Sequence, residues 1–219
     1  MKMKPAAYAI FGGIVLAFPA LLSSAAATKT DFDPQQSAPA GAQNPAVRAA
    51  VEAARPGGFH KRLEVLLGQW NTAWKVWHGP DQAPSDQATG SARFRSILGG
   101  RFIEGTYTGK GILGTTFEGR LFLGFDARRR EYSATWFNSF ETASNSYSGP
   151  LAVGEVAATP LRTLTLIGRP GPHPKVSDGS SRVTFTVDPK RVVEEQYATD
   201  LKGREFKAVE VVYTRAGAQ

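Results

Sequence analysis

From Gly68 onward, hydrophobic and polar residues alternate along the chain with a period of two. In "WNTAWKVWH", Trp70 and Trp74 fall on one face of an extended segment, while Lys75 falls on the other. About ten such segments follow one another, ending with "REFKAVEVVYTR", and turn residues separate them. This alternation is typical of strands that bury only one face. The pattern therefore predicts a domain built almost entirely of short β-strands.

The connections between the predicted strands are short. Gly99-Gly100, for example, joins "ARFRSIL" to "RFIEGTYTG", and adjacent glycines suit the positive φ angles of a tight hairpin. Parallel strands would need crossovers of a dozen or more residues, so the sheet is expected to be antiparallel. A sheet of about ten strands closes or splits in two, because open edges invite aggregation. Sequential hairpins favour closure, so we predict an all-β, up-and-down barrel.

A helical pattern precedes the strands. The segment "AVRAAVEAARPGGFHKRLEVLLG" is rich in alanine, and its last leucines have helical spacing. Pro56-Gly57-Gly58 interrupts the pattern. We therefore expect short N-terminal helices within residues 46–67 and a barrel domain over residues 68–216.

The first 27 residues have the composition of a secretory signal peptide. MKMK is followed by an uncharged apolar stretch and by Ala25–Ala27, a small-residue site for cleavage after Ala27. The alternative is an uncleaved membrane anchor, since the apolar run approaches the roughly 18 residues that span a bilayer. Gly12, Gly13 and Pro19 break the run and favour cleavage. A periplasmic or secreted protein without stable membrane insertion is expected, and residues 28–45, rich in Pro, Ala and Gln, read as a disordered linker.

Composition and charge narrow the classes of function. The chain has no cysteine, which excludes thiol nucleophiles and thiolate metal sites. Its 26 basic residues include Lys2 and Lys4 of the predicted signal peptide, so 24 remain against 19 acidic residues, a net charge of +5. The densest basic run, Arg128-Arg129-Arg130, lies in a predicted hairpin turn and not on an extended basic face. We therefore expect no nucleic-acid partner, and no sequence signal sets an oligomeric state.

The start and the end of the predicted barrel carry a matching pair of residues. Gly68-x-Trp70 follows a helix, and Arg215 ends the last strand in "VVYTR". This arrangement resembles lipocalin-like barrels, in which an arginine of the last strand stacks on such a tryptophan and closes one end. A guanidinium over an indole gains cation–π energy of about 1–2 kcal/mol when partly desolvated. The resemblance implies that Gly68, Trp70 and Arg215 form the barrel closure.

A more extensive resemblance covers about residues 60–215. The segments "HKRLEVLLGQW", "ILGGRFIEGTYTG", "FEGRLFLGFD", "YSATWFNSF" and "EEQYATDLKGREFKAVEVVYTR" stand in this order and are similar to a bacterial family known as domain of unknown function 1579. The resemblance implies a calycin-like, lipocalin-like barrel. That family carries no established activity, so the resemblance assigns no substrate and no functional residue.

Several aromatic residues are candidates to line the barrel interior. A barrel of this size can hold a small ligand in its interior. The alternative is that these residues form ordinary core packing. The candidate ligand-binding residues are Trp74, Phe94, Phe102, Tyr107, Phe117, Trp136 and Phe206.

Metal and haem sites find little support. His60, His78 and His173 are far apart in sequence and lack a metal-binding spacing. Some related ten-stranded barrels hold haem through one histidine, but neither His78 nor His173 is predicted inside this barrel. We expect no metal and no cofactor.

Catalytic motifs are equally sparse. The sequence lacks a Gly-x-Ser-x-Gly elbow, and Gly109, Gly111 and Gly114 belong to a hairpin loop and not to a phosphate loop. Three strand carboxylates, Glu104, Glu118 and Glu210, would have raised pKa values if they lay inside the barrel. No catalytic residue is assigned, and an enzyme is not the expected class.

We therefore predict an exported β-barrel that binds a small, mostly apolar ligand in its interior. The alternative is a non-catalytic envelope interaction or structural module that acts through its outer surface. A hydrolase or isomerase is the third reading, and it requires inward polar residues such as Glu104 and His78 to converge. The polar loop at residues 168–181 is either a lid or a surface loop.

Overall fold

The computed structural model describes residues 44–111, 114–168 and 181–217. Ten antiparallel strands form one closed barrel, and each strand pairs with its neighbours in sequence while β1 also pairs with β10. The predicted all-β, up-and-down barrel is confirmed. The strands are β1 (Gly68–Val76), β2 (Asp86–Ile97), β3 (Phe102–Lys110), β4 (Thr116–Asp126), β5 (Glu131–Asn138), β6 (Asn145–Pro150), β7 (Thr163–Gly168), β8 (Ser181–Val187), β9 (Arg191–Thr199) and β10 (Glu205–Arg215).

Short helices precede the first strand. They are α1 (Pro45–Ala53), α2 (Gly58–Arg62) and the 3₁₀ turn η2 (Leu63–Leu66), and a further 3₁₀ turn, η3 (Leu98–Gly100), joins β2 to β3. Helix α1 buries none of its side chains. Among the described residues, no helix combines the length and the hydrophobicity needed to span a membrane. The predicted signal peptide, residues 1–27, and most of the predicted linker and of the loop at 168–181 lie outside the described residues.

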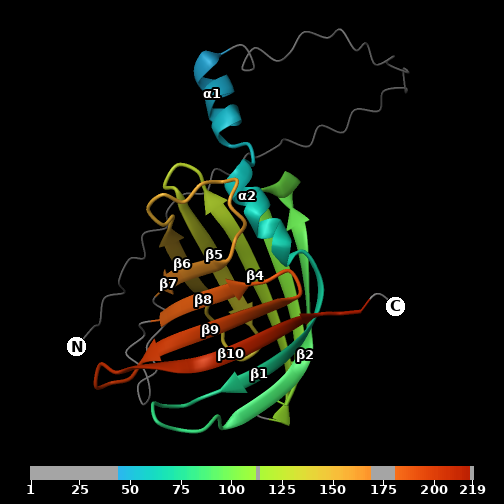
Figure 1. The fold of residues 1–219 in the computed structure, drawn as a ribbon, viewed down its shortest axis with the longest axis vertical. Helices are drawn as coiled ribbons and strands as arrows, with labels where there is room; N and C mark the ends of the chain where they lie inside the picture. Colours follow the sequence, from blue (N-terminus) through green and yellow to red (C-terminus); the bar gives the residue numbers. More distant parts are fainter. Residues whose placement is uncertain (1–43, 112–113, 169–180, 218–219) are drawn as a thin grey trace, which may run out of the picture. The chain divides into compact units, whose positions relative to one another are not determined.

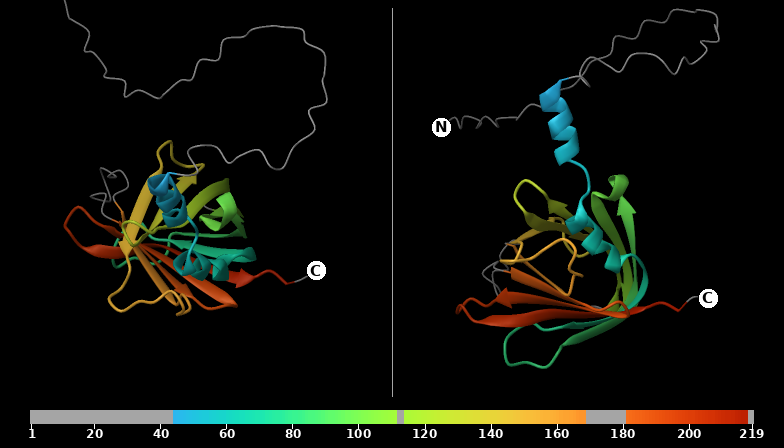
Figure 2. Two further views of the ribbon diagram at one scale, coloured as in Figure 1. Left: turned by 90° about the horizontal axis from the view of Figure 1, so that it is seen from above. Right: turned by 45° about the horizontal axis from the view of Figure 1, so that its top comes forward.

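Helix α2 and η2 close one end of the barrel, as the right-hand view of Figure 2 shows. Leu63 and Leu66 of η2 are 1% and 2% exposed and belong to the main core. The Phe59 ring of α2 packs on Phe125 of β4 with ring centroids 4.9 Å apart. His60 accepts a hydrogen bond from the Gly57 backbone N–H through Nδ1 at 3.0 Å, which caps α2. The covered end therefore consists of the chain segment directly before β1.

The first and last strands meet at this closed end, where β10 and β1 run side by side in Figure 1. Trp70 is opposite Arg215 in the register, and the Arg215 guanidinium carbon lies 3.9 Å from the centroid of the Trp70 ring. The Trp70 indole N–H donates to the Leu66 carbonyl at 2.8 Å. The stack therefore joins η2, β1 and β10 at a single point.

Arg215 also donates hydrogen bonds to carbonyl groups that have no intrahelical partner at the end of η2. Its guanidinium donates to the carbonyls of Leu67, of Val65 at 2.8 Å and of Pro189 at 3.0 Å. A methyl group at Gly68, where φ is +113°, would come within 2.8 Å of an Arg215 nitrogen. Glycine at this position therefore supplies both the backbone angle and the space that the arginine occupies.

We expect that replacing Arg215 with alanine lowers the free energy of unfolding by about 2–4 kcal/mol, because the ring contact and three hydrogen bonds to carbonyls are lost together. Urea unfolding followed by tryptophan fluorescence measures the change.

Arg182→Ala is the matched control. Arg182 lies over the Tyr197 ring at 3.8 Å and pairs with Glu205 at 2.7 Å, but on the outer face of the barrel. An exposed stack and ion pair contribute less than about 1 kcal/mol. Equal losses from the two substitutions would contradict a special role for the closure.

Candidate functional site

Alternate residues of every strand point into the barrel and form one continuous core. The side chains from β1 to β5 are largely aromatic. Trp74 packs on Phe117 with ring centroids 5.2 Å apart, Phe117 stacks on Trp136 at 6.0 Å, and Tyr107 meets Trp136 edge-on at 4.9 Å. Interlocking rings of this kind leave little free volume. Much of the interior is therefore solid core.

A polar cluster lies inside the barrel where β9 faces this aromatic group. Glu194 of β9 is 7% exposed. One of its carboxylate oxygens accepts a hydrogen bond from the Tyr213 hydroxyl, and the other accepts one from the Gln196 amide at 2.7 Å. The hydroxyls of Tyr213 and Tyr107 lie 3.3 Å apart. Residues from β3, β9 and β10 thus form one hydrogen-bonded network within the core.

Burial changes the acid–base behaviour of this network. Desolvation raises the pKa of Glu194, although the hydrogen bonds from Tyr213 and Gln196 act in the opposite direction. Burial also raises the pKa of Tyr107 and of Tyr213, and the neighbouring Glu194 charge adds to both increases. Both phenols therefore stay protonated and serve as donors to Glu194 or to each other. A carboxyl group inside a core is a common mark of a functional site.

The polar cluster borders a cavity of about 20 Å³. A space of this size accepts one water-sized group and no more. One wall is polar or aromatic and the other is aliphatic. The lining residues are Tyr107, Leu121, Ala134, Trp136, Tyr147, Leu166, Val183, Phe185, Glu194 and Gln196.

Three of the lining residues, Trp136, Tyr147 and Gln196, are half-buried. They come from the halves of β5, β6 and β9 that lie away from η2, so this side of the cavity faces the uncovered end of the barrel. Burial raises the pKa of Tyr147 to about 12. These three side chains separate the cavity from solvent.

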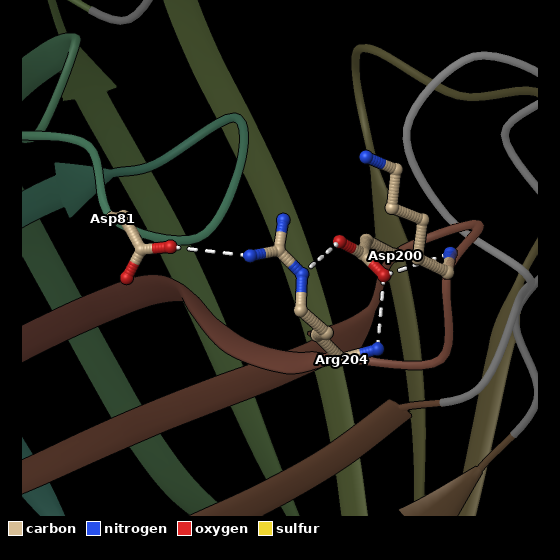
Figure 3. A network of polar contacts seen from close by, with 4 residues as sticks. Asp81, Asp200 and Arg204 are labelled. Atoms are coloured by element: carbon tan, nitrogen blue, oxygen red, sulfur yellow. Dashed lines mark hydrogen bonds and ion pairs between the residues drawn. The ribbon is translucent and has the colours of Figure 1, made fainter.

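Loops at the uncovered end are linked by a charged network, shown in Figure 3. Arg204, after the turn between β9 and β10, pairs with Asp200 at 3.0 Å and with Asp81 of the β1–β2 loop at 3.2 Å. The Asp200 carboxylate also accepts the backbone N–H groups of Lys202 and Arg204. These contacts fix two loops at the rim, away from the interior cavity.

The structure separates the predicted ligand-binding residues into three groups. Five are buried, namely Trp74, Phe94, Tyr107, Phe117 and Phe206. Trp136 is half-buried and lines the cavity together with Tyr107.

The prediction that Phe102 lines the barrel interior is wrong, because its side chain is 38% exposed. Phe102 and Tyr107 are five residues apart on β3 and must point to opposite faces of the strand. Tyr107 points inward, so Phe102 lies outside, where it covers Gly124. It cannot line an interior site.

The carboxylates considered for catalysis are also outside the barrel. Glu104 pairs with Arg95 at 2.6 Å and with Arg120 at 3.2 Å, both of them exposed arginines. His78 pairs with Asp86 at 3.2 Å in an exposed position after β1. Glu104 and His78 therefore do not converge inside the barrel, as the hypothesis of an enzyme required. Glu118 is exposed, and Glu210 pairs with Lys207.

Sequence reasoning missed Glu194, the carboxylate that is inside. In "RVVEEQY", each face of the strand receives one valine and one glutamate, so alternation does not identify the inner face. The register with β10 identifies the inner face of β9. Tyr213 and Val211 are buried, and they are opposite Val192 and Glu194. Tyr213 is two residues from Arg215, the residue expected to stack on Trp70, so both point to the same face of β10. This relation was the signal that the sequence offered for the inner face of β10.

No group of three or more potential metal ligands occurs within the described part of the chain. His173 lies outside that part.

Comparison with one solved structure supports the fold. The crystal structure of Rv2717c from M. tuberculosis matches with a TM-score of 0.55 and 12% identity, over 74% of this chain and 100% of that chain. The S-type phycobiliprotein lyase CPES from Guillardia theta matches with a TM-score of 0.44 and 9% identity, over 78% and 98% of the two chains. A de novo designed fluorescence-activating β-barrel matches with a TM-score of 0.36 and 14% identity, over 68% and 93%.

No curated protein matches the sequence. A family model does, over residues 55–215, which include the whole barrel and helix α2. Its description is "protein of unknown function (DUF1579)", and the chain belongs to this family.

Proposed function

We propose that this protein is an exported carrier or sensor that binds a small, mostly apolar ligand inside the barrel, next to Glu194. The observation that carries the proposal is the buried Glu194 carboxylate on the wall of an interior cavity. Few precisely placed polar groups in an otherwise apolar pocket are typical of small-molecule sites.

The position of Glu194 is costly for stability. A buried carboxylate loses hydration, and hydrogen bonds from neutral donors compensate for only part of that loss. An apolar residue would fill the same space between Val192 and Gln196 at lower cost. A side chain that a core does not need for packing is best explained by what it binds.

The cavity limits the part of the ligand beside Glu194 to one water-sized polar group. Leu121, Leu166 and Val183 provide the apolar wall. A body longer than the cavity would extend between Trp136 and Tyr147, which are half-buried at its outer side. Both side chains would have to move to admit it.

The proposed export is based on the sequence of residues 1–27, with its basic start, apolar run and alanine cleavage site. Export would place the ligand outside the cytoplasm.

A second candidate function is an interaction module that acts through the outer surface. It is favoured by the small size of the interior cavity and by a hollow of about 480 Å³ on the outer face of β3, β4 and β5. Glu118, Arg120 and Phe137 line that hollow, and Phe137 is 44% exposed. A partner of this surface would not depend on Glu194.

We expect Glu194→Gln to increase stability at pH values above the folded-state pKa of Glu194. Because the folded-state pKa of Glu194 is raised, the contribution of this group to the free energy of unfolding is fully present below about pH 4.5, the ordinary pKa of a glutamate. That contribution is lost as the pH rises through the folded-state pKa. Glutamine keeps the shape of the side chain without its charge. The free energy of unfolding of the variant should therefore exceed that of the wild type by about 1–3 kcal/mol, and it should not fall as the pH rises through this titration. Urea unfolding between pH 4 and pH 9 gives the comparison.

Glu195→Gln is the control for that experiment, since Glu195 points outward and pairs with Lys207 at 3.1 Å. An unchanged pH slope in Glu194→Gln would show that the buried carboxyl carries no stability cost.

We expect protein purified from its own host to carry a ligand that native mass spectrometry detects as an added mass, lost on denaturation. Val183→Ile should abolish the added mass, because one extra methyl group fills much of a cavity of about 20 Å³. Val187→Ile, on the same strand and equally buried but away from the cavity, should keep it.

A bare polypeptide mass, together with no saturation-transfer NMR signal from toluene, n-pentanol or n-pentylamine, would contradict interior binding and favour the interaction module.

A further inference from the structure

We infer that the ligand of the interior site is a small primary amine, whose ammonium group pairs with the Glu194 carboxylate among the rings of Tyr107, Trp136 and Tyr147. This inference rests on the proposed interior binding and adds the chemical class of the ligand.

The first argument is charge. Within the described part of the chain, the ion pairs that involve Arg, Lys or His do not include Glu194. Its partners are the neutral donors Tyr213 and Gln196, one to each oxygen. A carboxylate has about four acceptor positions, so each oxygen can accept at least one more hydrogen bond. The site therefore lacks a cation and has room for donors.

The second argument is the aromatic wall. Tyr107, Trp136 and Tyr147 line the same cavity as Glu194. Aromatic faces attract a cation within about 6 Å of the ring centroid, and the attraction grows when the cation is desolvated. An anionic ligand head would meet the Glu194 charge and the electron-rich ring faces, so this lining selects against anions.

The third argument is size. An ammonium group is close to a water molecule in size, and the cavity holds one such group. Two of its three N–H donors would fill the two acceptor positions that Tyr213 and Gln196 leave free on Glu194. The alkyl part of the ligand would extend outward from this cavity, between the half-buried side chains of Trp136 and Tyr147.

This pairing predicts a pH dependence. The groups that face Glu194 are Tyr213 from β10, Tyr107 from β3 and Gln196 from β9, with Tyr147 of β6 across the cavity, while β8 contributes only apolar side chains. An ammonium ligand needs the carboxylate form. Burial raises the pKa of Glu194, so affinity for the amine should rise with pH through this titration, and binding should release a proton.

We would titrate the protein recovered from its host, after removal of any retained ligand, with n-pentylamine and with n-pentanol at pH 8 by isothermal calorimetry. The two probes have the same chain length and differ in charge. Both head groups can donate to the Glu194 carboxylate, but only the ammonium group also forms an ion pair with it, so n-pentylamine should bind about tenfold more tightly.

Glu194→Gln should lower the affinity for n-pentylamine by about tenfold and lower that for n-pentanol less, because only the amine loses an ion pair. Glu195→Gln should change neither, because Glu195 lies on the outer face. Calorimetry repeated from pH 5 to pH 8, in buffers with different ionisation enthalpies, should detect proton release at the pH values where Glu194 is protonated in the free wild type. Glu194→Gln should release no proton at any of these pH values.

Each other outcome overturns the inference in a distinct way. If n-pentanol binds as tightly as n-pentylamine, or if amine binding strengthens as pH falls, the interior binds a ligand but Glu194 acts as a neutral donor. Equal amine affinities in the wild type and Glu194→Gln place the amine elsewhere. If neither probe binds, the proposed interior binding fails together with the inference.

Discussion

The stack of Arg215 on Trp70 is the contact on which the rest of the barrel depends. It joins the last strand to the first and also satisfies the carbonyls of Val65 and Leu67, where the preceding helical segment ends. Closure removes the free edges that a ten-stranded sheet would otherwise expose. It also fixes the register between β1 and β10, and in a sheet a shift of one residue turns every side chain to the other face. The chemistry of the interior is therefore set at the closed end.

The closed barrel brings two kinds of packing into one core. Rings from β1 to β5 interlock and leave little space, whereas β7 to β9 contribute mostly aliphatic side chains together with Phe185, Glu194 and Gln196. The cavity lies where the two kinds meet, and there the close packing of the core is incomplete. A polar group at that boundary can be hydrated or bind a ligand, while a polar group among the rings could do neither.

The fold could be predicted from the sequence because alternation, short turns and the Trp70–Arg215 pair all indicate the same architecture. The interior could be predicted only in part. Alternation identifies the two faces of a strand but not which one is inside, so Phe102 and Tyr107 were both assigned to the interior although their spacing allows only one of them. Glu194 was missed for the same reason, since both faces of β9 mix valine with glutamate. Those assignments require the register with neighbouring strands, which depends on contacts far apart in sequence.

The distribution of charge distinguishes the interior from the outer surface. Two glutamates are buried in the described barrel, Glu104 and Glu194. Glu104 lies beneath two arginines on the outer face, an arrangement that neutralises its charge and is fully explained by the fold. Glu194 has only neutral donors and borders a space that another group can enter. A charge that the protein neutralises itself serves structure, whereas Glu194, which no cation of the described residues neutralises, is where the proposed ligand would bind. The uncompensated carboxylate, and not the number of aromatic rings, is therefore the strongest indication of function in this barrel.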